Sequence, residues 1–330
     1  MKNSVNILVT GAAGYIGSVV TERLLVEGYR VIALDNLKQG HRQALSPETD
    51  FVRADLNDTA MLDDIFSRFQ IAAVMHLAAD SIVGESMTDP QRYFHTNVVC
   101  GLNLLATMLK HGVRKLVFSS SAAVYGMPEI SPVTENAPLI PVNPYGESKV
   151  MLERILKWYG AAYGLNSISL RYFNAAGATS RHGEHHEPET HLIPNVLKVA
   201  LGKAQQVSIF GTDYETEDGT CVRDYVHVLD IADAHLKALR RIDGAEVKAY
   251  NLGNERGYSV LEVVKTARRV TGVNIPVVFE PRRSGDPPFL VASSELVRDE
   301  LGWSPAYSEL MDILKSAWQW QSRFPSGYSG

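Results

Sequence analysis

The stretch VNILVTGAAGYIG at residues 5–17 decides the fold. A short apolar run, Val5–Thr10, ends in a glycine cluster, and helical apolar spacing follows over Ile16–Glu27. A glycine turn between a strand and a helix lets backbone N–H groups face a phosphate at the helix N-terminus. The spacing is GxxGxxG rather than the simplest GxGxxG, but its place directly after a strand predicts a dinucleotide-binding turn.

The alternation of short apolar runs with helical stretches continues along the first half of the chain. The expected strands are 31–34, 51–53, 73–77, 115–119 and 167–171, and the expected helices are 60–69, 91–110 and 145–163. Apolar strands separated by helices predict a parallel sheet covered on both faces, and right-handed crossovers make it doubly wound. We therefore expect an α/β fold: a Rossmann-like doubly wound parallel sheet with a smaller C-terminal α/β substrate domain.

The regular alternation of apolar strands and helical stretches ends after residue 175. Residues 175–190 are small and polar and indicate a long loop, and 211–220 indicate a second loop. The expected helices beyond it are 192–201, 228–241, 260–271, 294–301 and 309–323. We divide the chain into a dinucleotide-binding domain, 1–174, which also receives part of 222–245, and a substrate-binding domain, 175–330.

Composition excludes several classes of protein. The chain has 330 residues, of which 45% are hydrophobic, enough for a substantial core, and its net charge of −5 disfavours a nucleic acid partner. No apolar run approaches a membrane span, and residues 1–4 lead into the first strand without a secretory signal. The two cysteines, Cys100 and Cys221, make no disulfide framework. We expect a cytoplasmic protein with no membrane partner.

An aspartate at the end of the second strand points to the cofactor. The carboxylate of Asp35 is placed to accept hydrogen bonds from the adenosine ribose hydroxyls and to repel a 2′-phosphate, which predicts NAD. Asp55, after the third strand, is expected to face the adenine. Ala78 and Ala79 are small enough for the backbone to approach a bound cofactor.

A tyrosine and a lysine begin the helical stretch after Pro144. Tyr145 and Lys149 are four residues apart and share one helix face. A phenolate base at pH 7 needs a pKa about 3 units below its usual value, or ~4 kcal/mol. One positive charge ~4 Å away supplies about that much at an effective dielectric constant near 20. Lys149, helped by a nicotinamide cation, is therefore sufficient.

Three serines end the strand before this helix. Ser121 is placed to hold a substrate oxygen and shuttle its proton. Ser119 and Ser120 are explained more simply by local hydrogen bonds at a strand end.

Taken together, these motifs resemble a known family. TGAAGYIG (10–17), LDN (34–36), SSSAAVYG (119–126), YGESK (145–149) and RYFNAAG (171–177) are similar to the extended short-chain dehydrogenases/reductases. VRDYVHVLDIADAH (222–235), YNLG (250–253), PRRSGDPP (281–288) and WQWQSRFPSGY (318–328) resemble the UDP-glucose 4-epimerase family within them. The resemblance spans essentially the whole chain.

The resemblance assigns roles to individual residues. It implies that Tyr145 is the base, with Lys149 and Ser121 as its catalytic partners. The cofactor-binding residues that we expect are Gly11, Gly14, Tyr15, Ile16, Gly17, Asp35, Asn36, Asp55, Leu56, Leu77, Ala78, Ala79, Asn97, Ser119, Tyr145, Lys149 and Tyr172. The substrate-binding residues that we expect are Ser121, Tyr145, Asn174, His191, Leu192, Arg223, Arg283, Asp286 and Leu290.

The UDP site is the part of this set with an independent argument. The resemblance places Asn174, Arg223 and Arg283 on the UDP moiety and Asp286 on the uridine ribose. A diphosphate needs about two positive charges and suits bidentate arginines, which agrees with this. The neighbouring Arg282 is interpreted as a surface salt bridge. The family also places the residue seven positions after Arg283, here Leu290, beside the 2-substituent of the sugar.

The resemblance implies a redox-neutral reaction with UDP-glucose and UDP-galactose. The sugar is oxidised at C4 by NAD while Tyr145 takes the hydroxyl proton, and the 4-keto sugar rotates before it is reduced on its other face. A nucleotide-sugar dehydratase or decarboxylase would need an acidic residue where Ala122 and Ala123 stand. An epimerase for UDP-N-acetylglucosamine or a UDP-uronate remains open, as does a non-catalytic NAD-sensing protein.

Two positions depart from the family pattern. Asp80-Ser81 stand where some members have a lysine near the nicotinamide, and His191 stands where others have asparagine. The histidines His182, His185, His186 and His191 invite a metal site. However, Pro188 prevents a regular helix and no HExxH motif is present, so we expect no metal and a loop that covers the substrate.

The helical stretches 91–110 and 145–163 carry more apolar residues than one side of a sheet covers. These residues are Val98, Val99, Leu102, Leu105, Leu109, Val150, Leu152, Ile155, Leu156 and Tyr159. The resemblance implies that two copies of the chain join these helices in a four-helix bundle, so we expect a homodimer.

Overall fold

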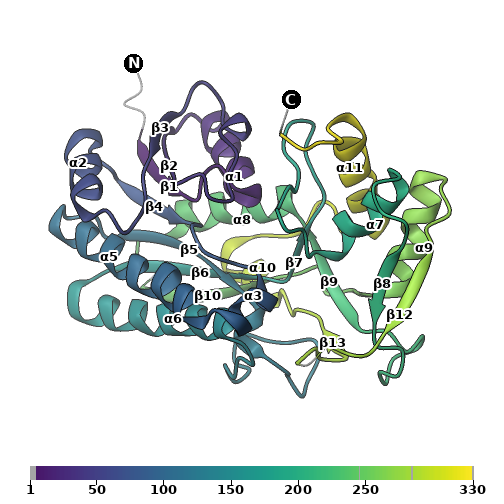
Figure 1. The fold of residues 1–330 in the computed structure, drawn as a ribbon. Coiled ribbons are helices and arrows are strands. Elements are labelled where there is room, and N and C mark those ends of the chain that lie inside the picture. Colours follow the sequence, from purple (N-terminus) through teal and green to yellow (C-terminus); the bar gives the residue numbers. More distant parts are fainter. Residues whose placement is uncertain (1–4, 245, 284, 329–330) are drawn as a thin grey trace.

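The computed structural model describes residues 5–244, 246–283 and 285–328. Residues 1–4, where no secretory signal was expected, and residue 284 of the 281–288 motif lie outside this description. Figure 1 shows a large sheet flanked by helices and, beside it, a smaller lobe formed mainly by the second half of the chain. The predicted α/β fold is confirmed.

The large sheet has seven parallel strands in the order β10-β6-β5-β4-β1-β2-β3. Their bounds are β1 Asn6–Thr10, β2 Arg30–Asp35, β3 Asp50–Arg53, β4 Ala73–His76, β5 Lys115–Ser121, β6 Asn166–Tyr172 and β10 Val247–Leu252. Strands β1 to β6 follow the 3-2-1-4-5-6 order of a dinucleotide-binding sheet. The analysis of the sequence did not predict β10, which forms an edge of this sheet beside β6.

Helices cover both faces of this sheet (Figure 1). One face carries α1 (Tyr15–Val26) and α8 (Val228–Arg241), and the other carries α2 (Thr59–Phe69), α5 (Cys100–Lys110) and α6 (Pro144–Tyr163). The single helix predicted at 91–110 is interrupted. Its parts are α4 (Pro90–Phe94), a π-helical turn (His95–Val99) and α5, and the short α3 (Val83–Thr88) precedes them.

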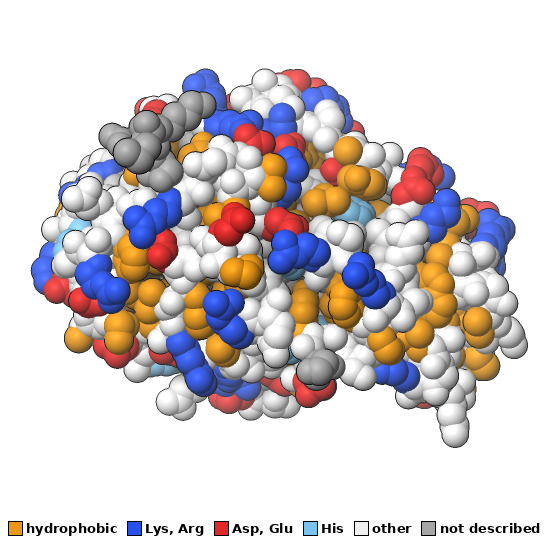
Figure 2. Space-filling model, turned by 90° about the horizontal axis from the view of Figure 1, so that it is seen from above, with side chains coloured by type: hydrophobic (Ala, Val, Ile, Leu, Met, Phe, Trp, Pro, Cys, Tyr) orange, Lys and Arg blue, Asp and Glu red, His pale blue; other side chains and the backbone are white. Residues whose placement is uncertain are grey.

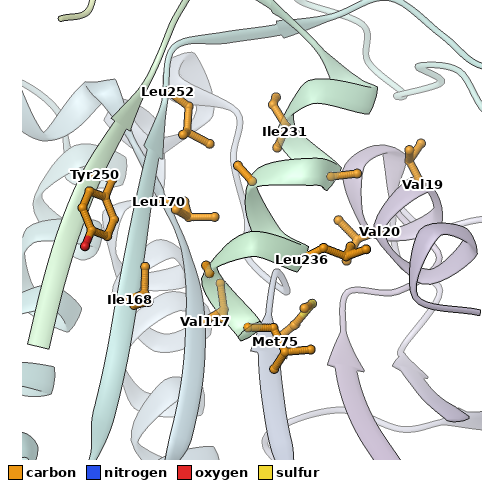
Figure 3. Close-up of a cluster of buried hydrophobic side chains, with 14 of the residues drawn as sticks. Val19, Val20, Met75, Val117, Ile168, Leu170, Ile231, Leu236, Tyr250 and Leu252 are labelled. Carbon is orange, nitrogen blue, oxygen red and sulfur yellow. The ribbon is translucent and has the colours of Figure 1, made fainter. Parts of the chain in front are cut away.

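Side chains of alternate strand residues point into opposite cores. Val9 packs on the face that α1 and α8 cover, whereas its neighbour Leu8 packs with α2 and α5. Figure 3 shows the first of these cores, where Val117 and Leu170 face Leu236 of α8. Burial on both faces explains why the strands are apolar throughout rather than alternating with polar residues.

The smaller lobe holds two small sheets and three packed helices. One sheet has the order β11-β9-β13 with β7 on β9, and the other pairs β8 with β12. The bounds are β7 Asn174–Ala176, β8 Val207–Phe210, β9 Val222–His227, β11 Gly257–Ser259, β12 Val277–Glu280, β13 Phe289–Leu290, α7 Leu192–Ala200, α9 Val260–Thr271 and α11 Leu310–Arg323. The short α10, Glu295–Leu301, instead packs against β10 and α8 of the large sheet. The expected contribution of 222–245 to the first domain covers α8, and β10 lies just beyond it.

The surface agrees with the composition. In the described ranges 5–244, 246–283 and 285–328, no helix is both long and apolar enough to cross a bilayer. On the face drawn in Figure 2, Lys and Arg side chains are interspersed with Asp and Glu.

Candidate active site

A cavity of about 690 Å³ lies at the carboxyl ends of the strands of the large sheet. Parallel α/β sheets bind their ligands at this edge. All of the predicted cofactor-binding residues line this cavity except Asn97 and Ser119. The fold therefore brings residues that are far apart in the sequence, from Gly11 to Tyr172, to the edge of one cavity.

The glycine turn between β1 and α1 has the shape of a phosphate cradle. Gly11 has a φ of +69°, and a Cβ there would lie 2.6 Å from the backbone nitrogen of Ala78. A Cβ on Gly17 would collide with the carbonyl oxygen of Gly11. Helix α1 begins after Gly14 with no side-chain cap, so its first N–H groups remain available to an anion in the cavity.

Asp35 is held at the end of β2 by two backbone groups. Its Oδ2 accepts from the N–H of Ala13 at 2.9 Å and its Oδ1 accepts from the N–H of Leu37 at 2.8 Å. Each carboxylate oxygen keeps a further lone pair for a ribose hydroxyl. Burial raises the pKa of the Asp35 carboxyl. The cradle and this oriented carboxylate fit the diphosphate and the adenosine ribose of NAD.

Three predicted catalytic residues, Ser121, Tyr145 and Lys149, line the same cavity. The side chain of Asn143 accepts from the N–H of Gly146 at 2.8 Å, and Pro144 occupies the first turn. This cap fixes the start of α6 and places Tyr145 and Lys149 on its cavity face. A hydrogen bond joins the side chains of Ser121 and Tyr145.

Burial dominates the electrostatics of this group. Lys149 Nζ donates to the carbonyl oxygen of Ser119 at 2.8 Å and lies 5.7 Å from the centroid of the Tyr145 ring. Burial lowers the pKa of Lys149 to about 7, and burial raises the pKa of Tyr145 above its usual value. Both shifts come from burial in the protein without a bound cofactor, whereas the expected effect of Lys149 on Tyr145 includes the charge of a nicotinamide cation.

Three strand-end and helix residues support the site from behind. The side-chain amide of Asn97 is satisfied by hydrogen bonds within the protein. Its Oδ1 accepts from Asp80 N at 2.9 Å, and its Nδ2 donates to Asp80 O at 3.0 Å. Ser119 supplies its carbonyl to Lys149, and Ser120 donates to Glu153 Oε1 at 2.6 Å. Ser119 and Ser120 therefore have the structural roles that were favoured from the sequence, and the structure places the Asn97 side chain outside the cavity.

The predicted substrate residues separate into two groups. Ser121, Tyr145, Asn174 and His191 line the cavity, whereas Leu192, Arg223, Arg283, Asp286 and Leu290 do not. The second group lies in the smaller lobe, where β13 places Leu290 beside Arg223 of β9, the strand that pairs with the β7 strand of Asn174.

Arg223 is the best-positioned cation of that second group. Its Nη1 donates to the carbonyl oxygens of Val222 and Pro287, both at 2.8 Å, and its Nη2 lies 3.3 Å from Asp286 Oδ1. This Nη2 is shielded from water and has no hydrogen-bond partner among the residues that the structure describes. An unsatisfied buried guanidinium nitrogen suits an incoming anion.

Arg283 and Arg282 differ in their contacts. The guanidinium carbon of Arg283 lies 3.9 Å from the centroid of the Phe210 ring. Arg282 pairs with Asp213 at 2.6 Å and is exposed, so the interpretation of Arg282 as a surface salt bridge is confirmed.

Several cavity residues were missed by the analysis of the sequence. Asp80 binds Arg92 through Nε at 2.9 Å and Lys38 at 3.5 Å, and all three residues line the cavity. Asp80 had been noted only for replacing a lysine. Its partners come from α4 and from the loop after β2, so only the fold reveals this pair of cations near the cofactor. Glu184 and His186 also line the cavity.

A doubly wound sheet with a glycine cradle, an oriented acidic residue and a Ser–Tyr–Lys group in one cavity defines a dinucleotide-dependent enzyme of the short-chain dehydrogenase/reductase type. Residues 7–253 match the model of the NAD dependent epimerase/dehydratase family. The chain belongs to this family, whose cofactor is NAD.

Individual members of this family that the chain resembles are UDP-glucose 4-epimerases. The chain is 51% identical to the UDP-glucose 4-epimerase of Halalkalibacterium halodurans over 98% of this chain and 97% of that protein. A crystal structure of a UDP-glucose 4-epimerase superposes with a TM-score of 0.96 at 47% identity, covering 98% of this chain and 100% of the other. The Bifidobacterium longum UDP-glucose 4-epimerase in complex with NAD+ and UDP superposes with a TM-score of 0.94 at 39% identity, with 98% and 100% covered.

Proposed function

We propose that this chain interconverts UDP-glucose and UDP-galactose by epimerisation at C4. The observation that carries the proposal is that Ser121, Tyr145 and Lys149 share one cavity with the glycine cradle and Asp35. Bound NAD supplies the hydride acceptor and donor. Residues 1–174 with α8 and β10 hold this cofactor, and the rest of 175–330 holds the UDP-sugar.

The residues of the chain supply proton transfer and orientation. Tyr145 takes the proton of the 4-hydroxyl group, and its hydrogen bond with Ser121 gives that proton a short path to the sugar oxygen. Lys149, anchored on the carbonyl of Ser119, places a positive charge beside the cofactor and the tyrosine ring. The protein returns to its starting state at the end of each cycle because the hydride goes back to the same sugar.

The UDP moiety is assigned to the smaller lobe. Arg223 is fixed by two backbone carbonyls and keeps one buried nitrogen unsatisfied, so it is ready for the diphosphate. Arg283 supplies the second charge, Asp286 the contact to the uridine ribose, and Asn174 a polar group on the cavity side. His191 and Leu192 border this region at the start of α7. The Bifidobacterium longum relative was solved in complex with NAD+ and UDP, which supports a UDP-containing substrate for this chain.

The alternatives have less support. The short helix after Ser121, Ala122–Tyr125, presents no carboxylate where a dehydratase needs one. A non-catalytic NAD sensor has no use for the Ser–Tyr–Lys group.

The deciding experiment is incubation with UDP-galactose and an assay for UDP-glucose. A protein that binds both sugars and NAD but never interconverts them would contradict the proposal. Parallel assays with UDP-N-acetylglucosamine and UDP-glucuronate separate this epimerase from its neighbours.

We also propose a cytoplasmic enzyme without nucleic acid or membrane partners. Cys100 and Cys221 are both free and buried, which suits a reducing compartment. Fractionation of the source cells is the direct test.

The protein is expected to carry NAD when it is purified without added cofactor. A redox-neutral cycle favours retention, and the cavity encloses the dinucleotide site on several sides. Absorbance of the supernatant after denaturation measures the NAD, and prolonged incubation with UDP plus free sugar is expected to build up NADH absorbance. A cofactor-free protein that works only with freely exchanging NADP would contradict both the retention and the role of Asp35.

We propose a homodimer in which α5 and α6 meet their copies. Part of the expected apolar set is core, since Leu105, Val150, Leu152 and Leu156 are buried within one chain. The apolar residues that stay exposed or half-buried form one stripe on each helix. The stripes are Val99, Leu102, Ala106 and Leu109 at the α5 end, and Met151, Ile155, Trp158 and Ala162 on α6. Trp158 is 75% exposed. So large an exposed apolar side chain is typical of a surface that another protein covers.

Light scattering at micromolar concentration is expected to give twice the chain mass. Trp158→Glu places a charge in the centre of the proposed four-helix contact and is expected to shift the protein toward the monomer. Lys157→Glu, one residue away and off the stripe, is the matched control. A wild-type monomer under these conditions would contradict the dimer.

The size of the sugar that the enzyme accepts is expected to depend on Leu290. A leucine at this position leaves more room beside the 2-substituent than a tyrosine would, so we expect slower but measurable turnover of UDP-N-acetylglucosamine. Overpacking costs ~1–3 kcal/mol, so Leu290→Tyr is expected to lower the acetylated reaction roughly ten- to a hundredfold more than the plain one. Comparison of kcat/KM for the two sugars tests this. Equal losses would leave Leu290 as a packing residue of β13.

A further inference from the structure

Four potential metal ligands converge in the loop between β7 and α7. The ligand atoms of Glu184, His186, Glu189 and His191 all lie within 4.8 Å of one another. His191 Nδ1 is 2.8 Å from an oxygen of Glu184 and 2.8 Å from an oxygen of Glu189, and His186 Nδ1 is 3.4 Å from the same Glu184 oxygen. His182 and His185, which the sequence grouped with them, lie elsewhere: His182 pairs with Glu22 on α1, and His185 stacks on His41.

Hydrogen bonding among the four side chains does not satisfy them. One nitrogen carries one proton, so His191 Nδ1 cannot donate a full hydrogen bond to two carboxylates at once. The Nδ1 of His186 is shielded from water and has no hydrogen-bond partner among the residues that the structure describes. The Glu184 and Glu189 side chains are only 8% and 2% exposed, so two carboxylates share a site with little solvent. A cation at the centre of this cluster would balance the two carboxylates.

We propose that Glu184, His186, Glu189 and His191 form a binding site for one Zn²⁺ ion. Two imidazole nitrogens and two carboxylate oxygens are a ligand set that zinc accepts and that Mg²⁺ and Ca²⁺ do not prefer. Zinc bonds of about 2.0–2.2 Å in a tetrahedron separate the ligand atoms by about 3.3 Å. Three of the separations here are 2.8, 2.8 and 3.4 Å, and all four ligand atoms lie within 4.8 Å of one another. Two carboxylates and two neutral imidazoles balance the charge of the ion.

The site is structural and goes beyond the proposed epimerase activity. Four protein ligands fill a tetrahedral zinc shell and leave no open position for a substrate oxygen. The ligands belong to one loop, which Figure 1 shows rising beside the C-terminal end of the chain, where Tyr328 donates to the carbonyl of Gly183 at 3.2 Å. Because Glu184, His186 and His191 also line the cavity, zinc would fix the wall of the dinucleotide site.

The analysis of the sequence considered the histidines alone and expected no metal. The pattern is Glu184-x-His186-x-x-Glu189-x-His191, in which the two glutamates supply half of the ligands. Pro188 excludes a helix, as expected, but the ligands come together without one.

Zinc binding by the holoenzyme tests the proposal. Protein purified without a histidine tag is stripped with EDTA, returned to metal-free buffer and titrated with Zn²⁺ against a chromophoric chelator. We expect one Zn²⁺ per chain. His186→Ala and Glu189→Gln are each expected to weaken binding more than tenfold, since even indirect partners of a metal typically contribute about 10- to 100-fold. His185→Ala and Glu187→Gln alter the same residue types in the same loop outside the cluster, and are expected to bind as the wild type does.

Two further readouts address folding and the structural role. Circular dichroism and NAD content identify any variant that fails to fold, and Glu184→Gln, which keeps the side-chain shape, then replaces it. Zn²⁺ is expected to raise the Tm of the wild type and not that of the cluster variants. A wild type that binds no Zn²⁺, or cluster variants that bind it as tightly as the wild type, would overturn the site. Turnover lost in proportion to zinc removal, with NAD still bound, would overturn the structural role.

Discussion

Tyr145→Phe is expected to lower kcat for UDP-galactose at least a hundredfold while NAD stays bound. The substitution removes the hydroxyl that takes the substrate proton and keeps the ring, and general bases contribute about 10²–10⁴-fold. Tyr145 is buried, and its hydroxyl hydrogen bonds to Ser121 in the cavity. The measurements are steady-state kcat and the NAD content of the denatured protein.

Tyr163→Phe is the matched control for this experiment. Tyr163 lies at the other end of the same helix and is 54% exposed, so its loss of a hydroxyl leaves the cavity untouched. Near wild-type turnover in Tyr145→Phe would show that another group is the base. Loss of NAD from Tyr145→Phe would mean instead that the tyrosine serves cofactor binding, and the kinetic effect would then say nothing about proton transfer.

The parts of the fold that could be predicted from the sequence are those with a local cause. The glycine turn and β1 to β6 follow from apolar runs that are buried on both faces, and the start of α6 follows from Pro144 and its Asn143 cap. Strand β10 escaped prediction because it forms an edge of the sheet, with Lys248 exposed, and pairs with β6 from far along the chain. The π-helical turn at His95–Val99 has no signal in the apolar spacing.

The same division holds for the site. Residues at strand ends and in the glycine turn could be placed in one cavity because the topology of a parallel sheet dictates it. Contacts between distant elements could not, such as Arg92 with Asp80, or Lys149 with the carbonyl of Ser119. The pKa of a buried side chain depends on these contacts and on burial, so the effect of Lys149 on Tyr145 could not be derived from their spacing alone.

Lys149→Met is expected to reduce turnover about a thousandfold, since it removes the ~4 kcal/mol that one nearby positive charge supplies to the tyrosine base. The methionine fills nearly the same volume without a charge. Turnover is measured at saturating substrate with NAD content as the check on the cofactor site. Lys157→Met, eight residues further along α6 and exposed, is the control.

The same substitution is expected to change how the stability of NAD-free protein depends on pH. Burial lowers the pKa of Lys149 to about 7 in the folded protein, whereas the unfolded chain keeps the usual 10.5. Between these two values the unfolded state binds more protons, so this lysine makes the wild type more stable as the pH rises. Lys149→Met removes that contribution. Its Tm relative to the wild type is therefore expected to be higher at pH 7 than at pH 9.5, whatever constant loss follows from the missing hydrogen bond to Ser119. A difference in Tm that does not change with pH would show that Lys149 stays charged in the folded protein over this range.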